Sequence, residues 1–312
     1  MQITSKRIIF LWFAFILLNV GVGSANAQQK AMFTQYMFNG LAINPAYSAI
    51  DESLNITALA RQQWVGFTGA PNTQTLSIHS PIKSSNTSMG VILMRDQIGE
   101  VISENGAFAT LAHRVQIADG TFLSLGVNGG ISSYIGEYSL TGSTTASTDP
   151  VFSDQNSKRG NFGAGLMLFS DKFYAGISSP FFYYRDIGGG SSSQTAYKPH
   201  YLMQGGYLVS LGPDVKFKPN VLVKYVSGSP VQIDVNANFL LKETLWLGGS
   251  LRSKDSFDIV AEVQVTPNIQ LGYSYDFTTS KLARVEKGSH EIVLNFRFAT
   301  KGSLSSFAQC YF

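Results

Sequence analysis

Apolar and polar residues alternate with a period of two along most of this chain. In FDIVAEVQV (257–265) every odd position is apolar, and the even positions include Asp258, Glu262 and Gln264. Successive side chains of a β-strand point to opposite faces, so this spacing predicts strands with one apolar and one polar face. Helical periodicity almost disappears after residue 50, which predicts an all-β fold.

Fourteen segments follow this pattern, and their links alternate in length. A tilted strand of roughly 9–11 residues crosses a bilayer, and most of the segments are that long or slightly longer. Links 66–72, 98–104, 138–159 and 180–198 are long, whereas KSSN, ADG, GPD, KE and TP are tight. This predicts a transmembrane antiparallel β-barrel of about 14 strands, with both termini at the tight-turn, periplasmic end. The predicted strands are 53–65, 73–82, 87–97, 105–117, 121–137, 160–170, 172–179, 199–210, 215–226, 231–241, 244–252, 256–265, 268–277 and 290–298.

A soluble secreted β-sandwich or propeller is the competing fold, because it also has one apolar face. The barrel is favoured because it leaves no strand edge exposed. It also explains aromatic residues near strand ends as an interfacial girdle; these are Trp64, Tyr134, Phe181, Tyr225, Phe277 and Phe298. In a barrel the polar face lines the lumen, which would hold Lys224, Asp234, Asn236, Asp258, Glu262, Asp276, Glu291 and Arg297.

The N-terminus has the features of a secretory signal peptide. Lys6 and Arg7 precede a short apolar run, and Ala25 and Ala27 form an Ala-x-Ala cleavage site. A retained membrane anchor is the alternative. We expect cleavage after Ala27 and localisation in the outer membrane as a multi-pass barrel. The expected organisation is a signal peptide (1–27), an N-terminal periplasmic or plug segment (28–52), the barrel (53–298) and a C-terminal tail (299–312).

Charge and cysteine content argue against several classes of partner. Without Lys6 and Arg7 the 23 basic residues fall to 21, against 20 acidic residues, so there is no electrostatic case for nucleic acid. The one cysteine, Cys310, forms no internal disulfide and no thiolate metal site. We expect no cofactor and no metal, and stability that comes from packing or from outer-membrane lipid.

The sequence contains no convincing catalytic motif. His79 and Ser80 are adjacent strand residues and point to opposite faces. His113 and His290 could each meet a Ser across strands, as a His on any barrel could. There is no Gly-x-Ser-x-Gly motif for a lipid hydrolase, and GGGSSS (188–193) lacks the Lys-Ser/Thr of a phosphate-binding loop. We therefore expect that the protein is not an enzyme.

Two segments have sequences that are more specific than a barrel strand or a solvent-exposed loop requires. FTQYMFNGLAINPAYSAI (33–50) has helical spacing up to Asn44, which predicts a short amphipathic helix that Pro45 ends. We expect this segment at the periplasmic mouth, where it tucks into or across the lumen as a plug before residues 45–47 lead into the wall. Loop GFTGAPN (66–72) is either a tight hairpin or a functional loop folded over or into the barrel. The candidate partner-binding or plug residues are Phe33, Tyr36, Asn44, Pro45, Tyr47, Trp64, Gly66, Gly69 and Pro71.

These segments resemble the PorP/SprF family of outer-membrane proteins of the type IX secretion system. The similarity rests on FTQYMFNGLAINPAYSA, RQQWVGFTGAPNTQTLSIHSPI, MGVILMRDQIGEV, AHRVQIADGTFLSLGVNGG and GSHEIVLNFRF, in that order along most of the mature chain. The ending AQCYF is a weaker match, since Pro and Arg are missing between Cys310 and Tyr311. The resemblance implies a non-enzymatic protein that binds, helps deliver or anchors a large secreted adhesin through the adhesin's C-terminal domain. It also implies contact with other type IX secretion components, and a role in gliding motility for some members.

A different function remains open from the sequence alone. The polar luminal face would also suit an outer-membrane channel for small-molecule uptake, although every large barrel shares that feature. Conductance separates the two, since a channel is open and an anchoring barrel is closed.

Overall fold

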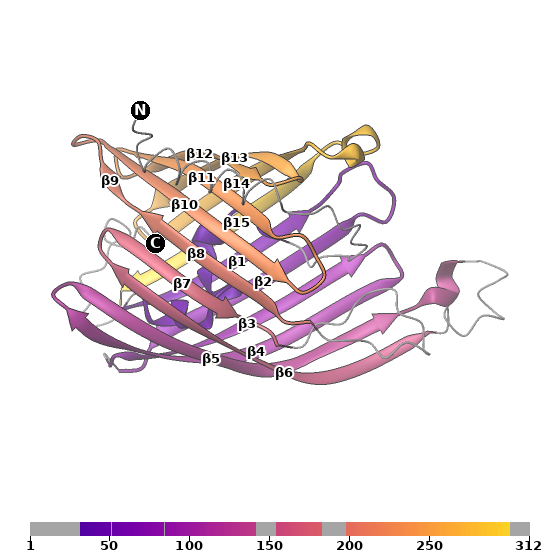
Figure 1. Cartoon of the computed structure of the whole chain (residues 1–312), viewed down its shortest axis with the longest axis horizontal. Coiled ribbons are helices and arrows are strands. Elements are labelled where there is room, and N and C mark those ends of the chain that lie inside the picture. Colours follow the sequence, from indigo (N-terminus) through magenta and orange to yellow (C-terminus); the bar gives the residue numbers. More distant parts are fainter. Residues whose placement is uncertain (1–31, 51, 84, 142–153, 183–197, 300–312) are drawn as a thin grey trace, which may run out of the picture.

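The computed structural model describes residues 32–50, 52–83, 85–141, 154–182 and 198–299. These form a closed antiparallel barrel, seen from the side in Figure 1. Among the described residues no helix is long and apolar enough to cross a membrane. The strands are β1 (Ser53–Gln62), β2 (Pro71–Pro81), β3 (Thr87–Ile98), β4 (Ile102–Ala118), β5 (Thr121–Gly136), β6 (Gln155–Ser170), β7 (Phe173–Ser179), β8 (His200–Tyr207), β9 (Val209–Ser210), β10 (Val215–Val226), β11 (Gln232–Leu241), β12 (Leu245–Arg252), β13 (Ser256–Thr266), β14 (Ile269–Thr278) and β15 (Ser289–Ala299).

Each strand pairs with its neighbours in sequence, and β1 pairs with β15 to close the barrel. Strands β8 and β9 both pair with β10 and are one strand interrupted at Leu208, so the fifteen described pieces make fourteen barrel strands. At the interruption the Leu208 N–H donates to the Lys172 carbonyl at 2.6 Å. The predicted fourteen-stranded antiparallel barrel is confirmed.

The two ends of the barrel differ in the length of their connections. At the end where β1 begins and β15 ends, the turns are short; residues 119–120 join β4 to β5, and residues 267–268 join β13 to β14. The opposite end carries the longer connections 63–70, 137–154, 180–199 and 279–288. We call these the short-turn end and the long-loop end. The predicted long link 98–104 is wrong: β3 and β4 continue to a tight turn at 99–101, where Gly99 has a φ of +61°.

Outward positions along the strands are apolar and inward positions are largely polar. Exposed outward residues include Leu125, Val235 and Ile259. The eight charged or amide residues that the sequence places in the lumen are all buried. The aromatic girdle is partly wrong: Tyr225, Phe277 and Phe298 are exposed, whereas Tyr134 and Phe181 are 7% and 4% exposed.

The lumen contains the chain's own N-terminal residues 32–50, which we call the luminal segment. It consists of three 3-10 turns, η1 (Tyr36–Phe38), η2 (Gly40–Ala42) and η3 (Pro45–Ala49). Asn39 separates η1 from η2, and extended Asn44 precedes η3. Thr34, Gln35, Asn39, Asn44 and Ser48 are almost completely buried. In Figure 1 the segment is the indigo coil inside the barrel wall.

Candidate functional site

The luminal segment folds into separate turns because its backbone is not helical at Asn39 and Asn44. Asn44 is extended, and its side-chain oxygen accepts from the Ala46 N–H at 2.9 Å, so it caps η3. Pro45 then occupies the first position of η3, where its missing N–H costs nothing. The predicted single amphipathic helix is therefore wrong. Residues 45–47 do not lead into the wall either, since they lie in the lumen and β1 begins at Ser53.

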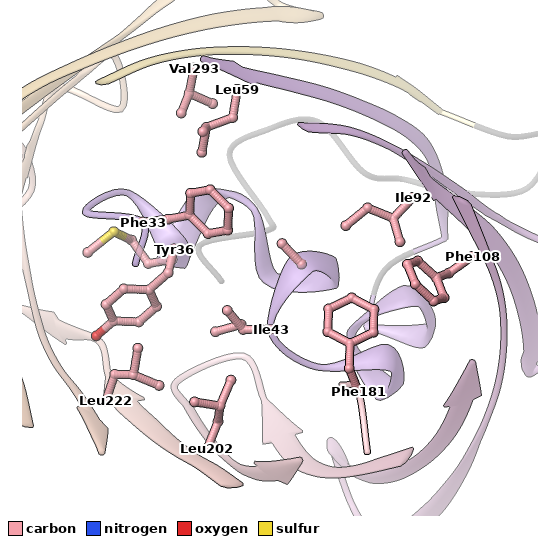
Figure 2. Close-up of a cluster of buried hydrophobic side chains, with 12 residues drawn as sticks. Phe33, Tyr36, Ile43, Leu59, Ile92, Phe108, Phe181, Leu202, Leu222 and Val293 are labelled. Atoms are coloured by element: carbon pink, nitrogen blue, oxygen red, sulfur yellow. The ribbon is translucent and has the colours of Figure 1, made fainter. Parts of the chain in front are cut away.

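The apolar face of the segment packs against inward-facing residues from all around the barrel. Phe33, Tyr36 and Ile43 form one buried cluster with wall residues, several of which are drawn in Figure 2. Six of the wall residues lie on β1, β3, β4, β8, β10 and β15, and Phe181 follows the end of β7. In chain order they are Leu59, Ile92, Phe108, Phe181, Leu202, Leu222 and Val293. These inward apolar side chains interrupt an otherwise polar lumen, and they are buried because the segment covers them.

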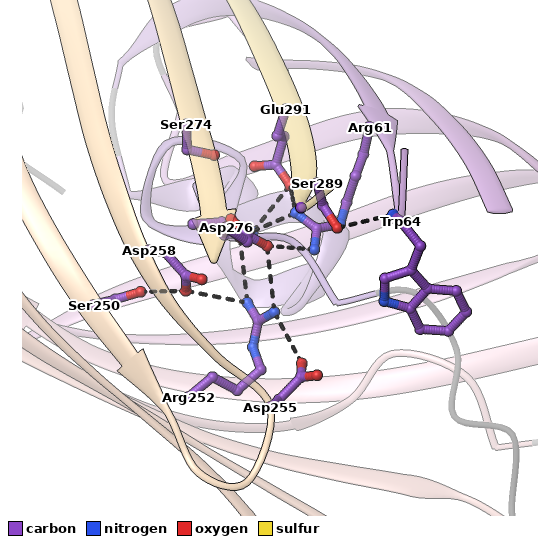
Figure 3. A network of polar contacts seen from close by, with 12 residues as sticks. Arg61, Trp64, Ser250, Arg252, Asp255, Asp258, Ser274, Asp276, Ser289 and Glu291 are labelled. Atoms are coloured by element: carbon purple, nitrogen blue, oxygen red, sulfur yellow. Dashed lines mark hydrogen bonds and ion pairs between the residues drawn. The ribbon is translucent and has the colours of Figure 1, made fainter. Parts of the chain in front are cut away.

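Polar contacts hold the N-terminal end of the segment to the seam between β1 and β15. The backbone N–H groups of Thr34 and Gln35 donate to the Glu291 carboxylate at 3.0 and 2.7 Å. The Thr34 hydroxyl donates to Asp276 at 2.8 Å and accepts from Arg61 at 3.0 Å. Arg61 also forms ion pairs with Asp276 and Glu291, and these three charged side chains are at most 2% exposed (Figure 3).

A second buried arginine extends this network to the neighbouring strands. Arg252 on β12 donates from Nε to both Asp234 oxygens at 3.1 Å, and its Nη1 lies 3.7 Å from Asp276. Its Nη2 lies 4.0 Å from Asp258, which accepts from the Ser250 hydroxyl at 2.6 Å. Buried charges need such pairing, because removing an ion from water costs several kcal/mol. The network therefore fixes Thr34 in one position near the long-loop end.

The prediction that places the segment at the short-turn mouth is incomplete, because the segment extends from there into the long-loop half.

The rest of the segment is held by contacts with β2, β5, β6 and β7. The Asn39 amide donates to Thr75 at 3.0 Å, and its oxygen accepts from Ser77 at 2.9 Å. The Asn44 amide donates to the Leu166 carbonyl at 3.1 Å. Further along, the Ser124 hydroxyl donates to the Ala46 carbonyl at 2.9 Å.

A cation–π cluster surrounds Lys218 in the short-turn half. Its Nζ lies 5.7 Å from the Phe38 ring centroid of the segment, 5.9 Å from Tyr174 and 5.5 Å from Trp246. Such contacts contribute up to about 2 kcal/mol when they are desolvated, and Lys218 is 1% exposed. On the other side of the lumen, the Tyr47 ring meets His79 edge-on at 5.8 Å.

The loop at residues 63–70 lies at the rim of the long-loop end, against residues 285–288. The Trp64 N–H donates to the Ser289 hydroxyl at 3.1 Å, and the Val65 N–H donates to the Gly288 carbonyl at 2.8 Å. Gly66 and Gly69 have φ values of +88° and +81°, which explains why glycine is used there. Trp64 also has a positive φ, +45°. Ser289 is two residues from Glu291, so the rim loop and the luminal segment are tied to the same strand end.

Comparison with known proteins identifies the family. The sequence model of the family described as "Type IX secretion system membrane protein PorP/SprF" matches residues 25–296. This chain belongs to the PorP/SprF family. It is thus an outer-membrane β-barrel of type IX secretion, and membership implies that it works with other components of that system. A comparison with curated proteins finds no match.

Solved structures similar to this PorP/SprF chain are outer-membrane barrels. One is the CymD monoaromatic hydrocarbon channel, with 11% identity, a TM-score of 0.50, and coverage of 90% of this chain and 95% of that one. Another is the TodX deltaS2S3 mutant monoaromatic hydrocarbon channel, with 10% identity, a TM-score of 0.50, and coverage of 84% and 94%. At these identities the similarity shows the fold alone.

The structure brings the sequence-predicted residues of this PorP/SprF protein into two places. Phe33, Tyr36, Asn44, Pro45 and Tyr47 lie in the lumen, whereas Trp64, Gly66 and Gly69 lie at the rim and Pro71 begins β2. Sequence reasoning missed the three basic residues Arg61, Lys218 and Arg252. All three occupy inward strand positions, so their place in the alternation was the available signal.

Two of the histidines considered as catalytic candidates bond other side chains. His113 bonds Thr87 at 2.8 Å and His290 bonds Tyr273 at 2.7 Å, so neither meets a Ser across strands. In the described part of the chain no group of three or more His, Cys, Asp or Glu residues is arranged to hold a metal ion. PorP/SprF is a family of secretion-system membrane barrels rather than a class of enzymes.

Proposed function

We propose that this PorP/SprF barrel binds a large type IX-secreted surface adhesin through the adhesin's C-terminal domain and helps to deliver it or anchor it at the cell surface. The observation that carries the proposal is the filled lumen. A barrel that transports solutes needs a continuous path, whereas residues 32–50 lie inside this one and contact the wall on many sides. Two cavities beside the segment, both lined by described residues, measure about 40 and 50 Å³.

In this proposal the luminal segment is a plug and the barrel is a rigid platform. The Arg61 ion-pair network holds the segment in the long-loop half of the barrel, and the cation–π cluster at Lys218 holds it in the short-turn half. A filled, rigid barrel offers its rims for contact with a partner, and ordered rim residues reduce the entropy cost of binding. Motility by gliding would follow where the anchored adhesin moves along the surface.

Deleting the gene tests this function. We expect one adhesin to disappear from the cell surface and accumulate in the periplasm or medium, while other type IX cargo still reaches the surface. Purification of the tagged barrel in detergent should recover the same adhesin's C-terminal domain. Normal surface display of every type IX cargo in the deletion strain would contradict the proposal.

A further inference from the structure

A basic surface lies at the long-loop end, where residues 279–288 follow β14. Lys281, Arg284 and Lys287 are exposed, and the first two belong to the short 3-10 helix η6 (Lys281–Arg284). Within the described part of the chain, none of these three side chains has a hydrogen-bond or ion-pair partner. The neighbouring acid, Glu286, is buried, and its carboxylate accepts from the Gly288 N–H. The three positive charges are therefore not neutralised within their own loop.

This loop is held in one conformation by the rim loop beside it. The Lys287 N–H donates to the Val65 carbonyl at 2.7 Å, and the Val65 N–H donates to the Gly288 carbonyl at 2.8 Å. A Cβ added at Gly66 would lie 3.7 Å from Lys287 Cγ, so the Lys287 stem lies over Gly66. Gly66 and Gly288 both have positive φ values, +88° and +86°. The basic surface is thus ordered before any ligand arrives.

Outward-facing aromatic rings lie directly below the basic surface, at the ends of β13 and β14. Phe257 and Phe277 are 45% and 47% exposed, and their rings stack across the two strands with centroids 6.3 Å apart. Tyr275 packs edge-on against Phe277 and donates its hydroxyl to the Lys287 carbonyl. Aromatic side chains at strand ends mark the headgroup level of the membrane. Lys287 is therefore tied to the wall at the depth where lipid phosphates lie.

We propose that Lys281, Arg284 and Lys287 form a binding site for the phosphate groups of an anionic membrane lipid in the leaflet at the long-loop end. Cations just above an aromatic belt attract anionic headgroups electrostatically. Val285, which is 56% exposed between two of them, supplies an apolar contact for the lipid. An acidic protein segment would satisfy the same charges, but the contact between Tyr275 and Lys287 places the site at the membrane surface, which favours lipid. The site is independent of the adhesin partner proposed above.

Native mass spectrometry of the full chain in neutral detergent tests this site. The probes are phosphatidylglycerol and phosphatidylcholine with identical acyl chains, titrated separately. We expect tighter binding of phosphatidylglycerol, and a loss on the order of a hundredfold in the variant K281Q/R284Q/K287Q, since each cation near an anionic lipid contributes about a factor of five. The preference should weaken as salt is raised, because these charges are exposed.

The matched control removes three exposed lysines from the short-turn end, in the variant K83Q/K172Q/K242Q. We expect it to keep the wild-type preference. The site is refuted if the wild type shows no preference, if the first variant retains it, or if both variants lose it equally. It is also refuted if the first variant binds phosphatidylglycerol normally and loses the adhesin domain instead, because the surface would then be a protein-docking site. Far-UV circular dichroism and heat-dependent gel mobility confirm that each variant is folded.

Discussion

Arg61 joins the first strand, the last strand and the luminal segment at a single side chain. Replacing it with Ala leaves Asp276 and Glu291 buried without their guanidinium partner. Breaking a buried pair on one side destabilises proteins by about 3–5 kcal/mol. We expect Arg61→Ala to lower the urea midpoint of the barrel in micelles accordingly, measured by tryptophan fluorescence.

Arg95→Ala is the matched control. Arg95 is exposed on the outward face, and its Nη2 donates to Gln97 at 3.3 Å. Exposed substitutions of this kind usually change stability by less than about 0.5 kcal/mol. Equal midpoints for the two variants would show that the buried network does not hold the fold.

The sequence predicts where single residues point better than what they contact. Period-two spacing places Asp276 and Glu291 in the lumen, and they are there. It does not pair Asp276 with Thr34, because these residues are 242 positions apart. Tyr134 and Phe181 also escape the pattern, because aromatic rings near strand ends suit a membrane girdle. Phe181 instead packs in the buried cluster with the luminal segment, and the Tyr134 hydroxyl bonds the Tyr138 hydroxyl at 2.8 Å.

At the scale of elements, the fit between β5 and η3 depends on a missing side chain. A Cβ added at Gly126 would lie 2.3 Å from the backbone nitrogen of Ala46, whereas one added at Gly129 on the same strand meets nothing within 4 Å. Overpacking typically costs about 1–3 kcal/mol. We expect Gly126→Ala to displace η3 and to raise protease cleavage within residues 32–50, while Gly129→Ala leaves it unchanged. Similar cleavage of both variants would contradict the packing of η3 against β5.

The luminal segment shows why its local structure was mispredicted. Apolar spacing alone favours a helix, in which each backbone N–H bonds the carbonyl four residues back. Here Asn39 has a non-helical backbone, with a φ of −134°, and its side chain bonds Thr75 and Ser77 on β2. Contacts with distant strands therefore override the helical periodicity, and the sequence of residues 33–50 alone cannot reveal those contacts.

At the scale of the whole molecule, the position of the segment can be tested by cross-linking. Asn39 bonds Thr75 on the inner face of β2, whereas Gln74 beside it is exposed on the outer face. In a Cys310→Ser background, we expect Asn39→Cys with Thr75→Cys to form a disulfide in intact cells, detected by gel mobility. The pair Asn39→Cys with Gln74→Cys should not, and cross-linking of both pairs alike would place the segment elsewhere.

Conductance tests whether the filled lumen is closed. We expect the full chain in planar bilayers to show no steady open state, since residues 32–50 lie inside the barrel and contact the wall on many sides. Removing the contacts of the segment, as in Gly126→Ala, should produce intermittent openings. A steady ohmic pore in the unaltered protein would favour the uptake channel over the anchoring barrel.

The barrel itself is predictable from sequence because each strand repeats the same alternation and each turn is local. Strand number and the difference between the two ends follow from that repetition. The exception is the connection at 98–104, where outward polar residues such as Arg95 and Asn105 obscure the continuation of β3 and β4 beyond the apolar band. The contents of the lumen are harder to predict, since they depend on which inward side chains meet across the barrel.

The seam between β1 and β15 also sets an order of assembly. The first residues of the luminal segment are bound by Asp276 and Glu291, which lie on the last two strands to be synthesised. Arg61 and Glu291 are direct partners across the closing pair of strands. Until the C-terminal hairpin arrives, the backbone N–H groups of Thr34 and Gln35 lack their carboxylate acceptor, and Arg61 lacks Asp276 and Glu291. The first residues of the segment are therefore fixed only when the wall closes, so a chain that ends before β14 leaves them exposed to proteases.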